Sequence, residues 1–282
     1  MKLCRFQLFA FPSGELTREE HEVHPQPSTG IIENEEVWEL SGEPQEILGV
    51  LAGNGAHAEL ARTGHNWPVS EVQLLPPSRP SKIVCVGRNY AEHAKELGNE
   101  APREPLIFLK PPSAIIAPEE PIALPAISQR VDYEGELAVV IGRRCHALGA
   151  DDDPSSYIGG YTCLNDVTAR DLQKGDGQWT RAKGFDTFCP FGPVLETSID
   201  LAHATLETRV NGIRKQSACL AEMIFSVDAI IRHMAQVMTL EPGDVIATGT
   251  PSGVGPLAPG DVVEVSVSGI GTLRNRVVGP QG

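Results

Sequence analysis

Residues 132–140 read Asp-Tyr-Glu-Gly-Glu-Leu-Ala-Val-Val, a run that alternates at first and then becomes wholly apolar. This pattern predicts a β-strand over Tyr133–Ile141, because successive strand side chains point to opposite faces. Glu134 and Glu136 would then share a face, with their Cα atoms roughly 6–7 Å apart. Two carboxylates beside an apolar face repel each other and are costly to desolvate. Either solvent covers them or a cation binds them.

A third acid favours the cation. Asp166 follows an apolar strand predicted over Tyr157–Leu164 and lies among neutral side chains. Three carboxylates with no His or Cys nearby suit a hard divalent cation, so we expect Mg²⁺ or Mn²⁺ rather than Zn²⁺, with Ca²⁺ as a further candidate. Water molecules would fill the coordination positions that the acids leave open on the metal, and a chelating substrate would replace these waters.

The composition favours a protein built mainly from strands. Glycine and proline contribute 28 and 23 of the 282 residues, which indicates many turns and short strands rather than a helical bundle. One clear helix is predicted after Ser226, which can cap it, and before Pro242. The expected fold class is α+β, predominantly β. Further strands are predicted over Lys82–Val86, Asp244–Thr248, Asp261–Val267 and Thr272–Val278.

The chain divides at a proline-rich linker. Residues 75–80 hold three prolines, which can continue neither a helix nor a central strand. Residues 1–78 carry 4 Lys or Arg against 12 Asp or Glu, a net charge of −8. We therefore predict a small acidic N-terminal domain over 1–78 and a larger body over 79–282. The small domain is expected to hold short strands and one helix near Pro44–Leu51.

Charge and hydropathy exclude several functional classes. The net charge is −14 and no run of Lys or Arg exceeds two residues, so a nucleic-acid partner is not expected. No apolar stretch approaches the roughly 20 residues of a membrane helix. The consecutive apolar residues within residues 1–10 are too few for the hydrophobic region of a signal peptide. We expect a cytoplasmic chain that starts at Met1. Its six scattered cysteines are expected to be reduced thiols, mostly buried.

Two motif matches carry no function. Residues 53–58 match the dinucleotide pattern G-x-G-x-x-A, but the preceding residues look helical, so the glycines are interpreted as a helix C-cap. His21 and His24 are flanked by acids and prolines, and we interpret them as part of a solvated loop rather than a metal site.

A candidate general base follows the first strand of the body. A short helical segment is predicted over residues 88–96, where His93 and Glu96 are three apart and share a face. A carboxylate beside a histidine orients the ring and raises its basicity, as a general base requires. The alternative is a surface histidine with an incidental neighbour. Because residues 99–105 are polar and contain proline, this segment is a candidate mobile lid.

Two further groups fit an anionic substrate. Lys183 is a lone cation within a segment of small and aromatic residues, although a surface lysine would give the same pattern. Thr250 lies in the glycine-rich turn at residues 247–255. Such turns expose backbone N–H groups and a hydroxyl to anions, and the alternative is simply a tight turn.

Taken together and in this order, these segments resemble the fumarylacetoacetate hydrolase family over about residues 80–280. The N-terminal 78 residues look like the small accessory domain of many bacterial members. The resemblance rests on VGRNY at 86–90 with His93 and Glu96, FLKP at 108–111, EGEL at 134–137, NDVTARD at 165–171, Lys183 before FDT at 185–187, and TGTPSGVG at 248–255.

The resemblance implies a mixed β-roll or β-sandwich body, usually as a homodimer, and a divalent metal. It also implies that a lid carrying His93 and Glu96 activates water, and that Lys183 stabilises negative charge developing on the substrate. The implied metal ligands are Glu134, Glu136 and Asp166, and the implied substrate contacts are Arg88, Gln173 and Thr250.

The function that the resemblance implies is a metal-dependent hydrolase. It would cleave a C–C bond in a small 1,3-dicarbonyl acid, such as an acylpyruvate or fumarylacetoacetate in aromatic catabolism, through a stabilised enolate. The alternatives on the same scaffold are an oxaloacetate decarboxylase and a 2-hydroxyhepta-2,4-diene-1,7-dioate isomerase or lyase. A non-catalytic metal-binding module is a third interpretation, but a structural ion needs neither His93 nor Lys183.

Overall fold

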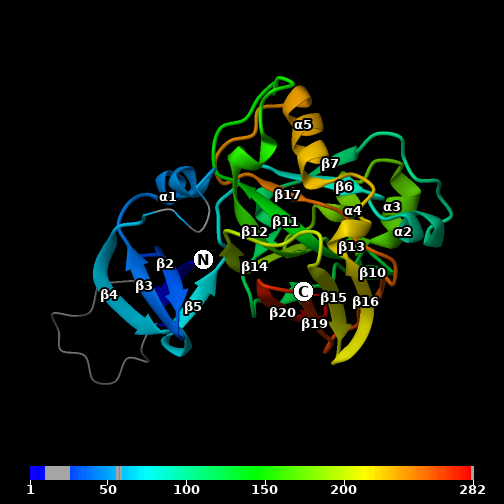
Figure 1. Cartoon of the computed structure of the whole chain (residues 1–282). Helices are drawn as coiled ribbons and strands as arrows, with labels where there is room; N and C mark the ends of the chain where they lie inside the picture. The colour runs from blue at the N-terminus through cyan, green and yellow to red at the C-terminus, as the bar shows by residue number, and fades with distance from the viewer. Residues whose placement is uncertain (10–25, 55–56, 58, 281–282) are drawn as a thin grey trace.

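Strands dominate the computed structural model, which describes residues 1–9, 26–54, 57 and 59–280 (Figure 1). His21 and His24 lie outside the described residues. The described strands form a 12-stranded, a five-stranded and a three-stranded sheet. This confirms the expected α+β fold in which strands predominate.

The 12-stranded sheet runs through the whole molecule. Its strands β11 (Gly135–Ile141) and β12 (Ile158–Asn165) pair antiparallel, with Glu136 opposite Leu164. Two further strands lie off the main path, where β5 (Val72–Leu75) pairs with β1 (Lys2–Leu8) and β8 (Ile115–Ile116) pairs with β14 (Cys189–Glu196). The main order is β4 (Arg62–Pro68), β3 (Glu36–Leu40), β2 (Ser28–Glu33), β1 (Lys2–Leu8), β14 (Cys189–Glu196), β12 (Ile158–Asn165), β11 (Gly135–Ile141), β17 (Val245–Ala247), β6 (Ile83–Gly87) and β7 (Leu106–Lys110).

The two smaller sheets and five α-helices complete the described fold. The three-stranded sheet has the order β13 (Thr168–Ala169), β10 (Val131–Tyr133) and β18 (Gly255–Pro256). The five-stranded sheet has the order β16 (Ile213–Cys219), β15 (Thr205–Val210), β19 (Val262–Val267), β20 (Gly271–Val278) and β9 (Ile122–Ala123). The helices are α1 (Pro44–Leu51), α2 (Ala91–Glu96), α3 (Arg170–Asp176), α4 (Thr180–Lys183) and α5 (Val227–Val237).

Helix boundaries follow the predicted caps. Ser226 Oγ accepts the backbone N–H of Ala229 at 3.3 Å and begins α5, whose apolar side packs into the main core. Helix α1 begins at a proline and has the predicted bounds. Gly53 follows the helix with a φ of 81°, whereas residues 55, 56 and 58 of the predicted C-cap motif lie outside the described residues. All six cysteines are free, and only Cys219 is partly exposed.

The N-terminal strands extend the sheet of the body. Strand β1 pairs antiparallel with β14, placing Lys2 opposite Glu196 and Leu3 opposite Leu195. Figure 1 shows β2, β3 and β4 on the outer side of this junction, away from the helices α2, α3 and α4. The domain boundary at residue 78 stays a prediction, because strands from both sides of it share one sheet.

The strand predicted over Tyr133–Ile141 is wrong in one respect, because it is interrupted at Glu134. Strand β10 ends at Tyr133 and pairs with β13 and β18, whereas β11 begins at Gly135 and pairs with β12 and β17. The chain therefore passes from one sheet to another at Glu134. A Cβ atom on Gly135 would lie 2.0 Å from Thr208 Oγ1, so only glycine fits at this crossing.

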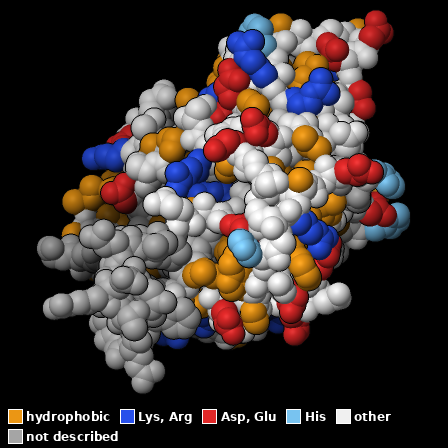
Figure 2. Space-filling view, turned by 90° about the vertical axis from the view of Figure 1, so that its left-hand side faces the viewer, with side chains coloured by type: hydrophobic (Ala, Val, Ile, Leu, Met, Phe, Trp, Pro, Cys, Tyr) orange, Lys and Arg blue, Asp and Glu red, His pale blue; other side chains and the backbone are white. Residues whose placement is uncertain are grey.

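The surface carries both signs of charge. On the face drawn in Figure 2, Lys and Arg side chains lie among Asp, Glu and hydrophobic ones, so the described part of this face has no continuous basic area. Among the described residues, no helix has both the length and the apolar character needed to cross a membrane.

Candidate active site

Three buried acids lie together at the crossing between sheets. Glu134, Glu136 and Asp166 each offer a carboxylate oxygen, and these oxygens lie within 4.8 Å of one another. Asp166 occupies a second crossing, between β12 and β13, and its backbone N–H donates to the carbonyl of Glu134 at 2.8 Å. The N–H of Glu134 donates in turn to Asn165 Oδ1 at 2.9 Å. The two crossings are thus held side by side, which brings the three acids together.

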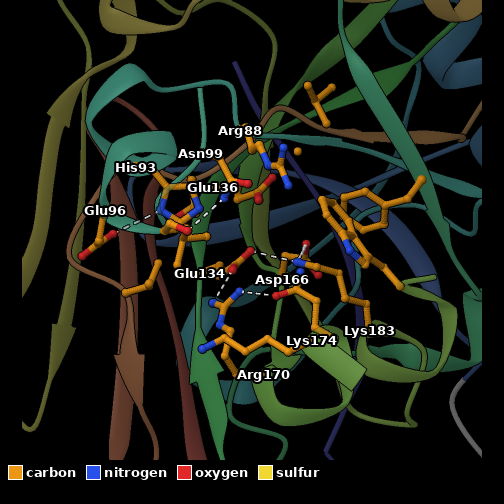
Figure 3. A pocket seen from close by; sticks show the side chains of 18 of the residues that line it. Arg88, His93, Glu96, Asn99, Glu134, Glu136, Asp166, Arg170, Lys174 and Lys183 are labelled. Carbon is orange, nitrogen blue, oxygen red and sulfur yellow. Dashed lines mark hydrogen bonds and ion pairs between the residues drawn. The ribbon is translucent and has the colours of Figure 1, made fainter. Parts of the chain in front are cut away.

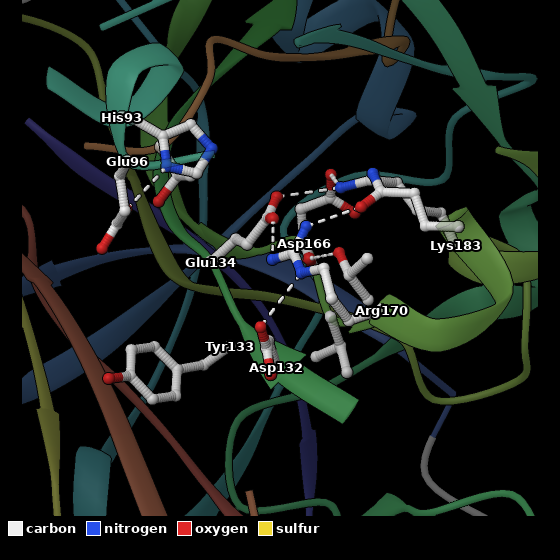
Figure 4. Close-up of polar contacts among 12 residues, drawn as sticks. His93, Glu96, Asp132, Tyr133, Glu134, Asp166, Arg170 and Lys183 are labelled. Atoms are coloured by element: carbon white, nitrogen blue, oxygen red, sulfur yellow. Dashed lines mark hydrogen bonds and ion pairs between the residues drawn. The ribbon is translucent and has the colours of Figure 1, made fainter. Parts of the chain in front are cut away.

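Buried cations surround two of these acids. Lys183 Nζ donates to Glu134 Oε2 at 2.8 Å and also to Asp166 Oδ2. Lys110 Nζ donates to the other oxygen of Asp166 at 2.6 Å. Arg170 donates to Glu134 Oε1 (Figure 4). Each contact is charge-assisted and shielded from water, so the carboxylate oxygens are held in fixed positions.

Arg170 is itself held in place by two neighbours. Its Nε donates to Asp132 Oδ2 at 3.0 Å, and its Nη1 donates to Gln173 Oε1 at 2.7 Å. Asp132 is completely buried and also accepts from Arg130 Nε at 2.8 Å. The chain of contacts from Arg130 through Asp132 and Arg170 therefore ends on Glu134.

The electrostatics differ sharply between the two glutamates. Burial alone would raise the pKa of Glu134, but the charges of Lys183 and Arg170 outweigh it and hold that pKa well below its usual range. Glu136 accepts the backbone N–H of Gly249 at 2.8 Å and has no ion pair with a described residue. Burial, reinforced by the charges of Asp166 and Glu134, raises the pKa of Glu136 well above its usual range.

This donor set fits a divalent metal ion. It supplies three buried carboxylates and no His or Cys, which matches a hard cation. Glu136 is the member that lacks a cationic partner among the described residues, and a metal ion would provide one. The structure thus brings together the three acids predicted as ligands.

A cavity of about 530 Å³ opens above the acids. All nine residues singled out from the sequence line it: Arg88, His93, Glu96, Glu134, Glu136, Asp166, Gln173, Lys183 and Thr250. Figure 3 labels all of these except Gln173 and Thr250. Their placement makes the predicted catalytic and substrate-binding roles possible in one site. The roles themselves stay predictions.

The candidate base lies on helix α2. His93 is only 4% exposed, and its Nδ1 lies 3.2 Å from Glu96 Oε2. Glu96 also accepts the backbone N–H of Gly253 at 3.1 Å, which ties the helix to the glycine-rich turn. A carboxylate at Nδ1 favours the tautomer with its proton there, which leaves Nε2 free to accept one.

Arg88 lies before the helix rather than inside it. Helix α2 begins at Ala91, and Arg88 has a φ of 60°, a conformation that a helix does not allow. Asn89 fixes this turn, since its Nδ2 donates to the carbonyl of Thr248 at 2.8 Å. The Arg88 guanidinium carbon lies 6.0 Å from the ring centroid of Trp179, at the cavity. The unusual backbone conformation directs this cation into the site.

Thr250 and Gln173 already have internal partners. The Thr250 hydroxyl donates to the carbonyl of Gly135 and accepts from Gln216 Nε2, each at 2.8 Å. Its proton is therefore not available to a substrate carboxylate. The Oε1 of Gln173 accepts from Arg170, so its amide N–H groups are the part left for a ligand.

Sequence reasoning gave no role to several residues of the site. Lys110 lies inside the FLKP string, where it is the lone cation at the end of an apolar strand. That position is the sequence feature that could have identified it as a site residue. Asp132 and Arg170 also lie within or beside the quoted strings. Their pairing across 38 positions is a property of the fold, and no local pattern indicates it.

Comparison with known proteins identifies the family. The family described as "Fumarylacetoacetate (FAA) hydrolase C-terminal" matches residues 82–278, which is most of the chain. The chain belongs to the fumarylacetoacetate hydrolase family. A second family, "Rv2993c-like, N-terminal", matches residues 23–77 of this family member.

Relatives across this family resemble the chain closely. Protein Rv2993c of Mycobacterium tuberculosis is 50% identical over 240 residues, covering 84% of this chain and 90% of the relative. The protein named "Oxaloacetate tautomerase FAHD2B, mitochondrial" of Bos taurus is 45% identical over 224 residues, covering 75% of this chain and 71% of the relative.

A solved structure extends the likeness to the fold. The crystal structure of 2-hydroxyhepta-2,4-diene-1,7-dioate isomerase from Mycobacterium marinum has a TM-score of 0.82 and 43% identity, covering the whole of both chains. The fold of the fumarylacetoacetate hydrolase family is therefore confirmed, and the chain is a member of an enzyme family. Tautomerase and isomerase activities are named among these relatives.

Proposed function

We propose that this enzyme is a divalent-metal-dependent tautomerase or isomerase of small 2-oxo dicarboxylates such as oxaloacetate. The observation that carries the proposal is the position of His93, paired with Glu96 on a cavity above three buried acids. The names of the Bos taurus relative and of the Mycobacterium marinum structure support it, because both describe isomerisations. They favour the isomerase alternative over C–C hydrolysis.

Glu134, Glu136 and Asp166 would hold the divalent metal, for which we propose Mg²⁺ or Mn²⁺. When bound, a divalent ion polarises the 2-oxo group and lowers the energy of the enolate. Lys110 and Arg170 keep one oxygen each of Asp166 and Glu134 occupied, which orients both carboxylates in the site.

His93 would move the proton. Tautomerisation breaks a C–H bond at the carbon next to the 2-oxo group and forms an O–H bond, with no net oxidation. With Nδ1 directed at Glu96, the Nε2 of His93 would accept the proton from carbon and transfer it to the 2-oxo oxygen, which forms the O–H bond, and the reverse transfer restores the C–H bond. Lys183 donates to Glu134 and Asp166 in this structure, so it would have to release these oxygens to the metal ion before its charge could stabilise a negative charge developing on the substrate oxygen. Arg88 would bind a substrate carboxylate.

C–C hydrolysis requires one more step on the same residues. His93 would have to activate water for attack on a second carbonyl, whereas decarboxylation would need no proton transfer from carbon. We assign neither as the main activity, because the names of the relatives favour proton transfer. Both are measured in the test.

The test follows enol-oxaloacetate by its ultraviolet absorbance in the presence of Mg²⁺, with Mg²⁺ alone as the blank. Acylpyruvate cleavage and CO₂ release are assayed in parallel. We expect enzyme-dependent conversion of enol to keto form with little cleavage or CO₂. Efficient acylpyruvate cleavage without tautomerisation would replace the proposal with hydrolysis.

We further propose that the enzyme works in the cytoplasm as a homodimer on small oxo acids, without nucleic-acid or membrane partners. The net charge of −14 supports the absence of a polyanion partner. Light scattering of the purified protein would give twice the mass of 30.3 kDa if the dimer proposal holds.

A further inference from the structure

Among the residues that the structure describes, five Lys and Arg side chains line the active-site cavity, and three of them are already paired. Lys183 binds two of the acids, Arg170 binds Asp132 and Glu134, and Arg130 binds Asp132. Arg88 and Lys174 also line the cavity, and neither has an ion pair with a described residue. These two cations are therefore the ones available to a ligand.

The two available cations lie on different elements. Arg88 precedes helix α2, whereas Lys174 lies on α3. In the view of Figure 3 they are on opposite sides of Glu134 and Asp166. Both cations line the cavity that contains these acids, so a ligand in the cavity can contact a cation from each of the two segments.

Helix α3 explains why Lys174 faces the cavity. Arg170, Gln173 and Lys174 are three and four positions apart, so they share one side of the helix, and all three line the cavity. Arg170 is buried against Asp132, which fixes the rotation of the helix. The amide N–H groups of Gln173 make no hydrogen bond to a described residue and lie beside Lys174.

The charges of the site also favour an anionic ligand. Glu134, Glu136, Asp166 and Asp132 are balanced in number by Lys110, Lys183, Arg170 and Arg130. Among the described lining residues, Arg88 and Lys174 add two positive charges and Glu96 adds one negative charge, and a divalent ion on the acids would increase this positive excess. A dicarboxylate offsets more of the excess than a monocarboxylate does.

We infer that Lys174, with the amide of Gln173, binds the distal carboxylate of the substrate and makes the enzyme selective for 2-oxo dicarboxylates over 2-oxo monocarboxylates. This inference rests on the proposed function. Lys174 is exposed in the absence of ligand, so a monocarboxylate leaves it solvated at no cost but gains nothing from it. Lys174 is therefore a specificity-determining residue, while His93 remains responsible for proton transfer.

Binding of two unreactive ligands tests the inference directly. Oxamate carries one carboxylate beside a carbonyl, and N-oxalylglycine adds a distal carboxylate. Calorimetry on the Mg²⁺-loaded protein should show that Lys174→Met weakens N-oxalylglycine binding by about tenfold, the loss expected for one charge-assisted interaction. Oxamate binding should change less than about twofold, and Lys174→Arg should restore most of the loss.

Lys95→Met is the matched control, because Lys95 is an exposed lysine on α2 that does not line the cavity. It changes net charge equally and should leave the affinity ratio of the two ligands unchanged. Equal weakening by both variants would reduce the effect to long-range electrostatics and overturn the inference. So would an unchanged ratio in Lys174→Met, which would make Lys174 an ordinary solvated lysine.

Kinetics separate this inference from the proposed function. With enol-oxaloacetate, Lys174→Met should raise KM by about tenfold and change kcat less than about threefold, because the ammonium group binds the distal carboxylate equally well in the ground state and the transition state. If the unmodified enzyme does not tautomerise oxaloacetate, the proposed function fails whatever the ligands bind. If it does, but KM is unchanged in the variant, only the inference on Lys174 fails.

Discussion

The backbone N–H of Asp166 donates to the carbonyl oxygen of Glu134 at 2.8 Å, and this bond joins the two places where the chain changes sheet. Residues at such crossings leave the regular strand pattern, so their side chains can converge on one point. Glu136, one position into β11, completes the group. The acid cluster is thus a property of sheet topology.

We expect His93→Ala to lower the tautomerase kcat by on the order of 10²–10⁴, the usual contribution of a general acid–base group. His203→Ala is the matched control, because His203 also lies three residues from its acid partner, Asp200, but is 85% exposed and outside the cavity. Stopped-flow absorbance on enol-oxaloacetate gives both rates. A His93→Ala enzyme with full kcat would remove this residue from the mechanism.

Metal removal should abolish activity. We expect excess chelator to stop turnover and added Mg²⁺ or Mn²⁺ to restore it, because in the proposed function the three acids would hold an ion that lowers the energy of the reaction. Glu136→Gln should weaken Mg²⁺ binding in calorimetry by at least about tenfold. Glu264→Gln, an acid outside the cavity, serves as control. Full turnover in chelator would show that the acids hold no catalytic ion.

Lys110→Met should destabilise the fold. The Lys110 side chain is completely buried, and its replacement removes one of two cations that contact Asp166. Breaking such a buried pair leaves a partly uncompensated carboxylate, and we expect the free energy of unfolding in urea to fall by about 3 kcal/mol. Exposed Lys95→Met should cost less than about 0.5 kcal/mol. A decrease below about 1 kcal/mol for Lys110→Met would mean that Lys183 alone compensates Asp166.

The N-terminal strands should lose stability in mild acid. Burial would raise the pKa of Glu39, but hydrogen bonds from Ser28 and Thr63, at 2.7 and 2.8 Å, outweigh it and lower that pKa. A carboxyl group whose pKa is lower in the folded than in the unfolded protein stabilises the fold at pH values above the unfolded pKa of about 4.3. This stabilisation is lost as the pH falls through the pKa of the folded protein.

Thermal unfolding from pH 7 to pH 3 checks this prediction. Glu39→Gln should lower Tm slightly at pH 7 and lose its difference from the unmodified protein near pH 3. Glu59→Gln is the control, because Glu59 is exposed and its side chain has no such hydrogen bond with a described residue. A constant difference across the range would assign the effect of Glu39→Gln to packing rather than to charge.

The elements were predictable where short-range chemistry determines them. Ser226 caps α5 and a proline begins α1, and both helices have close to the predicted bounds. The acids Glu134, Glu136 and Asp166 were predicted as a group from their residue types and positions near strand ends. For both helices, residues close together in the sequence determine where the element begins or ends.

The remaining features depend on contacts between distant segments. The break at Glu134 arises because β10 and β11 pair with different partners, and alternation within residues 132–140 gives no sign of it. The Thr250 hydroxyl faces Gly135 rather than the cavity because Gln216, from another strand, holds it there. The pairing of Lys110 with Asp166 likewise joins residues 56 positions apart.

The tight crossing at Gly135 divides the enzyme into a fixed part and a replaceable part. Any side chain there would strike Thr208, so the acid-bearing backbone tolerates little redesign. Helices α2 and α3 bring His93 and Lys174 to the cavity from outside that crossing. Exchanging the cavity-facing residues of these two short helices, with Arg170 retained because it contacts Glu134, is therefore the natural route for an engineer, or for gene divergence, to change the chemistry while the acid-bearing scaffold is inherited intact.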